Sequence, residues 1–171
     1  MNTGSNSDTR TAAEPGRYLT FTLGRESYGV PVLSVREIIR VCPITPVPRV
    51  PQYIRGVINL RGKVIPVLDL RAKFGMSEGG YGERACIVLL QVGVPPVPVT
   101  QIGVMVDGVE EVVALSAAEL GAVPDFGGSL DTRFLMGLAT VRGAVKTLLN
   151  LNAILAEEGT VSIPVVSPPA P

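Results

Sequence analysis

The stretch IRGVINLRGKVIPVLDLRAKF, residues Ile54–Phe74, decides the fold of this chain. Two runs within it are rich in β-branched residues, which favour strands: Ile54–Leu60 and Lys63–Leu68. Arg61-Gly62 separates the two runs, and glycine accepts the positive φ angle that a tight hairpin turn requires. Asp69 is suited to cap a short helix after the second run. The stretch therefore predicts a strand, a turn, a second strand and a short helix.

The same pattern returns later in the chain as GLATVRGAVKTLLNLNAIL, residues Gly137–Leu155. When it is laid on Gly56–Phe74, it repeats the Arg-Gly turn and keeps apolar residues at corresponding positions of the second strand. A fainter repeat precedes each copy, as YGVPVLSVREI (Tyr28–Ile38) and as IGVMVDGVEEV (Ile102–Val112). Repetition of such a unit predicts two similar β subdomains in one chain.

The segment after Pro31 has the periodicity of a helix. Its apolar residues gather on one arc of an ideal helical wheel: Val32, Val35, Ile38 and Ile39. Charged residues occupy the opposite arc: Arg36, Glu37 and Arg40. Because proline also suits the first turn of a helix, we expect a short helix here. Leu33 lies among the charged residues. It is either a single exposed leucine, which the segment alone favours, or the margin of a partner-binding groove.

The second half of the chain reads as further strands. A near-continuous apolar strand covers Arg84–Val92, and Gln101–Val106 is expected to pair back with it. Asp107-Gly108 is a strong hairpin signal, with Val109–Leu115 as the return strand. The connecting loop Gly93–Thr100, GVPPVPVT, exceeds the usual hairpin loop of about two to five residues.

Composition excludes several classes of function. The chain of 171 residues carries fifteen basic and fifteen acidic residues, so it lacks the overall basic field of a nucleic-acid-binding protein. No apolar run approaches the roughly twenty residues of a membrane helix, and the N-terminal residues lack the apolar segment of a signal peptide. We therefore expect a cytoplasmic protein without direct membrane insertion.

The residues that most often carry catalysis or metal binding are absent. The chain has no histidine, and it shows no phosphate-binding loop, dinucleotide-binding, zinc or nucleophile-elbow pattern. Its two cysteines, Cys42 and Cys86, are not in a metal-type spacing and are expected to be apolar fillers rather than a disulfide. The sequence predicts a protein that is not an enzyme and that needs no cofactor or metal.

The two ends of the chain differ in composition from the rest. Met1–Gly16 is polar without an apolar period, and Gly159–Pro171 ends in a proline-rich tract. Both are expected to be disordered tails around one domain, residues 17–158.

Four blocks of sequence together resemble the CheW family of chemotaxis coupling proteins: TFTLGRESYGVPVLSVREI, IRGVINLRGKVIPVLDLRAKF, IGVMVDGVEEVVALSAAEL and FLMGLATVRGAVKTLLNLNAIL. They occur in family order from about Tyr18 to Leu155. The resemblance implies a mainly β fold with short helices, in which two small five-stranded SH3-like β-barrels pack through a shared core. It also implies a non-catalytic scaffold that couples the cytoplasmic tips of chemoreceptors (methyl-accepting chemotaxis proteins) to the histidine kinase CheA. Such a scaffold would be recruited to membrane-associated receptor arrays.

The resemblance also implies a receptor-binding groove between the barrels, which falls on Val35, Glu37, Ile38, Gly56, Arg61, Gly103, Val109, Val112 and Gly137. The regulatory domain of CheA would contact exposed barrel surfaces. Two departures from the family pattern lie outside the groove positions: the long loop Gly93–Thr100, and a proline-rich end in place of a longer helix.

Arg61 has two interpretations from the residues alone. It is a solvated turn residue, which its repetition at Arg142 supports, or a binding residue, which the resemblance favours. Two alternatives to the receptor–kinase function also remain open. A CheW-like adaptor of a non-flagellar system, such as a type IV pilus cluster, would carry the same blocks. A small β-barrel that binds nucleic acid would need a basic face with exposed aromatic residues, and the balanced charge speaks against it.

Overall fold

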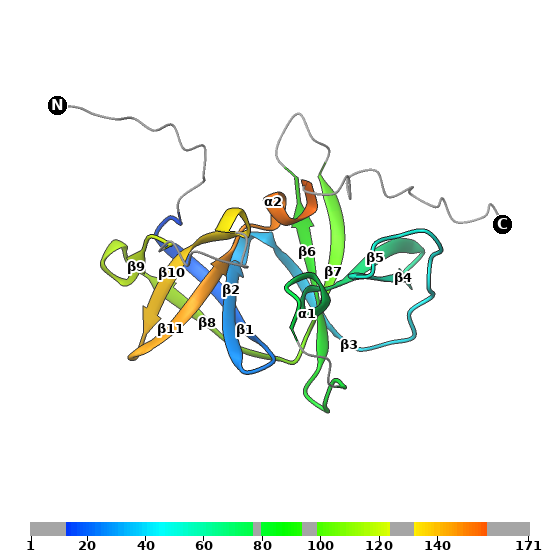
Figure 1. The fold of residues 1–171 in the computed structure, drawn as a ribbon, viewed down its shortest axis with the longest axis horizontal. Coiled ribbons are helices and arrows are strands. Elements are labelled where there is room, and N and C mark those ends of the chain that lie inside the picture. Colours follow the sequence, from blue (N-terminus) through cyan, green and yellow to red (C-terminus); the bar gives the residue numbers. More distant parts are fainter. Residues whose placement is uncertain (1–12, 77–79, 94–98, 124–131, 157–171) are drawn as a thin grey trace.

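A computed structural model describes residues 13–76, 80–93, 99–123 and 132–156 of the chain, and its strands form two sheets side by side (Figure 1). The six-stranded sheet has the order β8-β1-β2-β11-β10-β9 and contains β1 (Gly16–Leu23), β2 (Glu26–Pro31), β8 (Gly108–Leu115), β9 (Leu120–Gly121), β10 (Leu135–Val141) and β11 (Ala144–Leu149). The five-stranded sheet has the order β3-β6-β7-β5-β4 and contains β3 (Val35–Arg40), β4 (Ile54–Leu60), β5 (Lys63–Asp69), β6 (Cys86–Val92) and β7 (Thr100–Val106).

The remaining elements are short. They are the helices α1 (Leu70–Lys73) and α2 (Leu151–Ala156) and the 3₁₀ turns η1 (Val32–Ser34), η2 (Ala117–Glu119) and η3 (Thr132–Phe134). The predicted mainly β fold with short helices is confirmed. Within the described residues, however, the ladders do not close either sheet into a complete barrel. No helix in these ranges is long and apolar enough to span a membrane.

The stretch Ile54–Phe74 folds as the sequence predicts. β4 and β5 are joined by a turn in which Arg61 has φ 52° and Gly62 has φ 87°, the positive pair typical of a type I′ hairpin. Asp69 caps α1, because its Oδ1 accepts hydrogen bonds from the backbone N of Arg71 at 3.0 Å and of Ala72 at 3.4 Å.

The second copy has the same local structure. β10 and β11 are joined through Arg142 (φ 49°) and Gly143 (φ 81°), and Asn150 caps α2 through a hydrogen bond from the backbone N of Ala153 at 3.1 Å. The ladder β4–β5 shifts register between Ile54 and Gly56, and the ladder β10–β11 shifts at the equivalent place. The predicted duplication is confirmed down to the turn and the bulge.

The two repeats are interlocked. The first repeat contains β1–β5 with α1, and the second contains β6–β11 with α2. Each repeat places its first hairpin, β1–β2 or β6–β7, in the sheet that holds the later strands of the other repeat. Two equivalent parallel pairings make these joins, β11 with β2 and β5 with β7. Neither repeat therefore contains a complete sheet.

The expected helix after Pro31 is wrong. η1 covers its first turn, and β3 then pairs with β6 in the register Ile38↔Val88 and Ile39↔Ile87. Burial along β3 alternates with a period of two. The β-branched residues of this segment satisfy a strand as well as a helical arc, and pairing with the buried strand β6 decides between them.

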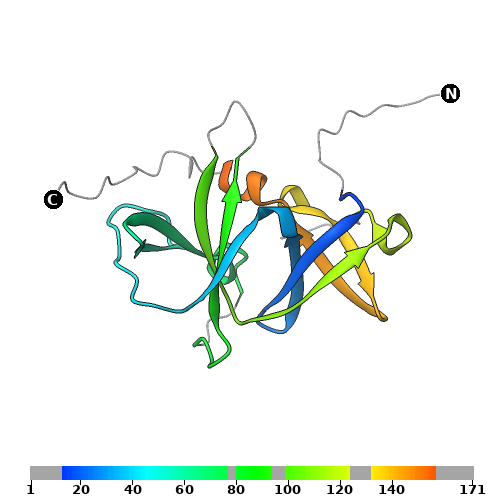
Figure 2. The ribbon, with the colours of Figure 1, turned by 180° about the vertical axis from the view of Figure 1, so that it is seen from behind.

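The expected hairpin at Asp107-Gly108 is also wrong. The chain turns there, but β7 belongs to the five-stranded sheet and β8 pairs with β1 in the six-stranded sheet. The connection crosses from one sheet to the other, as the connection β2–η1–β3 does in the opposite sense (Figures 1 and 2).

Both sheets share one apolar core. It includes Leu19, Phe21 and Val30 from the six-stranded sheet and Leu68, Val88, Leu90 and Val104 from the five-stranded sheet. Each sheet also has a smaller apolar cluster of its own, separate from the shared core. Burial of one common core makes the two halves a single packing unit.

Two predicted features lie largely outside the described residues. These are the tails, apart from 13–16, and the loop Gly93–Thr100, of which 94–98 are not described. At the N-terminal end, the backbone N of Ala13 donates to Met136 O at 3.3 Å, and β1 begins at Gly16. Contacts with the domain thus begin before residue 17.

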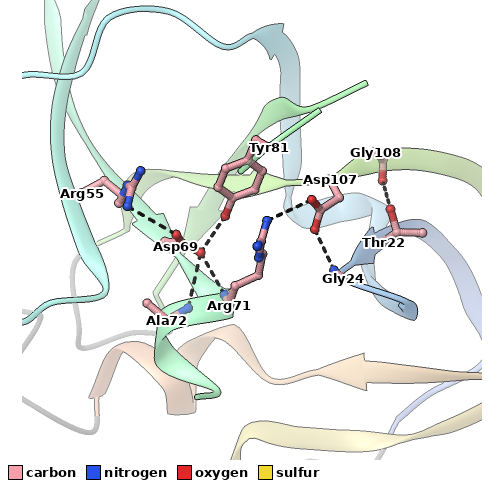
Figure 3. A network of polar contacts seen from close by, with 9 residues as sticks. All are labelled: Thr22, Gly24, Arg55, Asp69, Arg71, Ala72, Tyr81, Asp107 and Gly108. Carbon is pink, nitrogen blue, oxygen red and sulfur yellow. Dashed lines mark hydrogen bonds and ion pairs between the residues drawn. The ribbon is translucent and has the colours of Figure 1, made fainter. Parts of the chain in front are cut away.

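A polar network joins the two sheets beside the β7–β8 crossover (Figure 3). Asp107 accepts from the Arg71 guanidinium at 3.1 Å through Oδ1 and from the backbone N of Gly24 at 2.7 Å through Oδ2. The backbone N of Asp107 donates to Thr22 O at 2.9 Å. Asp107 thereby ties α1 of the first repeat to the β1–β2 turn of the other sheet.

Asp69 extends this network into the five-stranded sheet. It accepts from the Tyr81 hydroxyl at 2.6 Å and lies 3.8 Å from the Arg55 guanidinium. Arg71, which is buried, also stacks over the Tyr81 ring at 4.5 Å. Burial, and then the hydrogen bond to Asp69, raise the pKa of Tyr81, so its hydroxyl keeps its proton and donates at neutral pH.

The interlocked repeats lead to a first prediction. Two separately produced fragments, residues 1–78 and 79–171, should each lack cooperative unfolding, because each leaves the strand edges for its partner unpaired. Mixed in equal amounts, they should assemble into one folded species whose melting temperature rises with concentration. Circular dichroism during thermal unfolding measures both. A fragment that folds alone would contradict the interlocked arrangement.

The junction network leads to a second prediction. Replacing Asp107 by Ala removes the carboxylate from the buried Arg71 and an acceptor from Gly24, so unfolding free energy should fall by roughly 2–4 kcal/mol. Asp107→Asn keeps an acceptor but loses the charge, so its unfolding free energy should lie between those of the parent protein and Asp107→Ala. Urea denaturation measures the change. Glu83→Ala, at an exposed position, is the matched control and should stay within about 0.5 kcal/mol of the parent protein. An equally small change in Asp107→Ala would show that the network does not join the sheets.

Candidate functional site

The candidate site lies on the face that the two crossover strands share. Figure 2 shows β3 and β8 extending from the junction between the sheets toward opposite sides. Val35 begins β3, Val109 lies near the start of β8, and both pack against the shared core. Further along each strand stands an exposed apolar residue: Ile38 is 45% exposed and Val112 is 46% exposed. Four of the predicted apolar site residues therefore occur as two matching pairs, one pair on each strand.

Arg61 and Glu37 form an ion pair with two hydrogen bonds. The Arg61 guanidinium donates to Glu37 through Nη1 at 3.0 Å and through Nη2 at 2.6 Å. Glu37 lies on β3 and Arg61 in the β4–β5 turn, and β3 and β4 are the two end strands of the five-stranded sheet. The pair thus connects the ends of this sheet, as does the backbone bridge between Thr45 and Val57 at 2.8 Å.

The pair is open to solvent on one side. The Arg61 side chain is 70% exposed and the Glu37 side chain 35%. The hydrogen bonds from Arg61 lower the pKa of the Glu37 carboxyl, and the same bonds raise the pKa of Arg61. Both side chains are therefore charged at neutral pH, and both are accessible to a partner.

Three predicted site residues are glycines, and each has a structural reason to be glycine. Gly56 has φ +143°, and a Cβ there would lie 2.1 Å from Thr45 O. A Cβ on Gly137 would lie 2.8 Å from Gly121 O, and one on Gly103 would lie 2.8 Å from Ile87 Cγ2. The close approaches at Gly56 and Gly137 are the places where the chain beyond β3 or β8 returns to β4 or β10. A receptor contact by these glycines stays a prediction.

The structure brings six of the nine predicted residues into the five-stranded sheet and its β4–β5 turn: Val35, Glu37, Ile38, Gly56, Arg61 and Gly103. Strand register places Glu37, Gly103 and Gly56 in one row across it, through Leu89 and Val67. Val109, Val112 and Gly137 lie in the six-stranded sheet.

Sequence reasoning missed two features of this face. It did not pair Glu37 with Arg61, because the expected helix gave Glu37 the wrong neighbours. It also assigned no partners to Glu110 and Glu111, whereas Glu111 forms an ion pair with Arg142 and Glu110 forms one with Lys146 at 3.1 Å. The repeat itself carried the signal for Glu111 and Arg142, because they stand at the positions of Glu37 and Arg61 in the second copy.

The Arg61–Glu37 pair leads to a third prediction. The pKa of Glu37 should lie below its ordinary value and should rise toward that value in Arg61→Ala, because the charged form loses its hydrogen-bond donors. The stabilisation that the pair gives is present above the ordinary pKa and is lost as pH falls through the lowered one. Titration of the side-chain carboxyl carbon by NMR measures the shift.

Glu119 is the matched control for this titration. Its pKa is also lowered, by hydrogen bonds from the backbone N of Ser116 at 2.8 Å and from the Ser116 hydroxyl at 2.9 Å. These bonds do not involve Arg61, so Arg61→Ala should leave the pKa of Glu119 unchanged. An unchanged pKa for Glu37 in this variant would show that the pair does not form in solution.

Comparison with known proteins assigns the chain to a family. The model of the CheW-like domain matches residues 17–159. The chain is 36% identical over 141 residues to the chemotaxis protein CheW of Klebsiella aerogenes, covering 82% of each chain. It is 34% identical over 140 residues to the protein FrzA of Myxococcus xanthus, covering 81% of this chain and 84% of FrzA.

A solved structure agrees with these matches. The crystal structure of the scaffolding protein TtCheW from Thermoanaerobacter tengcongensis superposes with a TM-score of 0.75 at 30% identity, covering 85% of this chain and 95% of that one. The chain belongs to the CheW-like family and is a non-catalytic scaffold of chemotaxis signalling.

Proposed function

We propose that this protein couples chemoreceptors to the histidine kinase CheA in chemotaxis signal transduction. It acts in the cytoplasm, recruited to membrane-associated receptor arrays, and it binds the receptor tips on the face formed by β3 and β8. The regulatory domain of CheA takes a different exposed surface. Membership of a family of chemotaxis scaffolds supports the proposal.

One observation carries the assignment of the receptor face. The accessible ion pair Arg61–Glu37 stands beside exposed apolar side chains on a face whose inner residues belong to the shared core. A receptor tip is a helical hairpin, and such a partner presents apolar anchors flanked by charges. Val35, Ile38, Val109 and Val112 supply the apolar contacts, and Arg61 and Glu37 supply charged groups at the margin.

Leu33 adds to this surface. It is 97% exposed in η1, directly before β3, and two further residues of the same segment, Ile38 and Val41, are also exposed. Three exposed apolar side chains within nine residues favour the margin of a binding surface over an isolated leucine. Gly56 and Gly137 contribute close backbone approaches that shape the two sheets beneath it, and Gly103 leaves room for the Ile87 side chain.

An adaptor of a non-flagellar system, such as a type IV pilus cluster, would use the same two kinds of partner. The receptors and the kinase that co-purify with the protein from its own cells decide between the two systems.

The proposal leads to a fourth prediction, on Arg61→Asp. Asp tolerates the left-handed conformation that Arg61 adopts, so the variant should fold normally. It places a negative charge beside Glu37 and the receptor, and receptor binding should weaken about tenfold or more. Kinase activity in reconstituted receptor–kinase assemblies measures the coupling, with circular dichroism as the folding control. Arg25→Asp, at an exposed arginine in the β1–β2 turn, is the matched control and should couple normally.

A charge-swapped variant distinguishes direct contact of Arg61 with the receptor from an indirect role of Arg61 through Glu37. Glu37→Arg combined with Arg61→Asp restores an ion pair of reversed polarity. If Arg61 contacts the receptor, the swapped protein should still couple poorly. Recovery of coupling would show that Arg61 acts only through Glu37, and normal coupling by Arg61→Asp would remove Arg61 from the site.

A further inference from the structure

The protein contains a second ion pair built like the first. Arg142 of the β10–β11 turn donates to Glu111 of β8. The internal repeat places Glu111 at the position of Glu37 and Arg142 at the position of Arg61. Both arginines have a left-handed backbone, with φ 52° for Arg61 and 49° for Arg142.

The two pairs also match in accessibility. Arg142 is 70% exposed and Glu111 37%, against 70% and 35% for Arg61 and Glu37. Each pair joins an end strand of its sheet to the turn of the hairpin near the opposite end. Each strand of the first repeat therefore has an equivalent in the second repeat, and each pair has an equivalent in the other sheet. The two sheets, with their ion pairs, are thus related by an approximate two-fold axis.

The surroundings of the two pairs correspond as well. Val109 and Val112 stand at the positions of Val35 and Ile38, and Gly137 stands at the position of Gly56. Val145, the second residue of β11, is 60% exposed and adds an apolar side chain to the second half. The proposed receptor face already includes Val109, Val112 and Gly137, so its second half is complete only with Glu111 and Arg142.

Glu110, the neighbour of Glu111 on β8, differs from Glu111 in its partners. Glu110 accepts from the buried Lys146 at 3.1 Å and from the Ser27 hydroxyl at 3.2 Å. Lys146 stands where the first repeat has the buried Ile65, so Glu110 neutralises a charge that the other sheet does not contain. Glu110 therefore pairs with a buried cation of its own sheet, whereas Glu111 pairs with the exposed Arg142.

We propose that Glu111 and Arg142 form the second charged margin of the receptor-binding face. The inference rests on the proposed receptor function and extends it. A helical hairpin consists of two antiparallel helices, which are themselves related by an approximate two-fold axis. A face with two equivalent halves fits such a partner with one helix against the Glu37–Arg61 half and the other against the Glu111–Arg142 half. Continuity with Val109 and Val112 on β8 assigns this margin to the receptor rather than to the kinase.

The test measures binding of the full-length protein to two probes, a purified receptor cytoplasmic hairpin fragment and the regulatory domain of CheA. Arg142→Asp should weaken binding of the receptor fragment about tenfold and leave binding of the kinase domain unchanged. Arg25→Asp should leave both unchanged. If Arg142→Asp lowers the melting temperature, Arg142→Asn replaces it, because Asn also suits a left-handed residue and removes the guanidinium without adding a negative charge.

The possible outcomes separate this inference from the proposed function. If Arg61→Asp weakens receptor binding and Arg142→Asp does not, the second margin is overturned and the receptor function stands. If Arg142→Asp weakens only kinase binding, the surface belongs to the kinase and the inference is overturned. If neither variant changes receptor binding, the proposed receptor face itself fails. Loss of receptor binding in both variants, with kinase binding retained, supports two equivalent margins.

Discussion

The exchange of hairpins between the two repeats is the constraint on which the rest of the structure depends. A strand needs partners on its edges, and here the partners for β1–β2 come from β8 and β11, while those for β6–β7 come from β3 and β5. The chain must then cross between sheets twice, after β2 and after β7. The crossovers place the starts of β3 and β8 at the junction, where Val35 and Val109 pack on the common core. The location of the proposed receptor face is thus a direct result of strand exchange.

Close backbone approach is the second requirement of this arrangement. Both sheets are strongly curved. In the five-stranded sheet the chain beyond β3 meets β4 at Thr45, and in the six-stranded sheet the chain beyond β8 meets β10 at Gly121. Gly56 and Gly137 permit these approaches because they have no side chain. The ion pairs of Arg61 and Arg142 bring the hairpin turns to the same end strands. The site and the curvature of the sheets therefore depend on some of the same residues, which is why two glycines of the predicted groove, Gly56 and Gly137, have this structural explanation.

Local patterns predicted the local structure well. The tight turn at Arg61-Gly62 and the cap by Asp69 follow from residue types within a few positions of one another, and the duplication follows from comparing two stretches of the sequence. The strand β3 was not predicted by its local sequence, because its β-branched residues fit a helical arc as well as a strand. Only pairing with β6 distinguishes the two. The crossover at Asp107 was read as a hairpin for the same reason: a turn signal fixes a change of direction but not the strand that will be paired next. The pairs Glu37–Arg61 and Glu111–Arg142 join residues that are 24 and 31 positions apart, so they depend on a tertiary arrangement that no local pattern contains.

The left-handed turns at Arg61 and Arg142 have a consequence for how such a scaffold can change its partners over time. The backbone at these positions restricts which residues fit, since β-branched side chains disfavour a positive φ, but the side chains themselves extend into solvent. Selection can therefore alter the charge at either turn while the sheet beneath it keeps its shape. Duplication makes this freedom larger, because one turn can retain the ancestral contact while the other diverges. A scaffold built from two interlocked copies can in this way acquire unequal halves, and so an orientation for its partner, without separating into two domains.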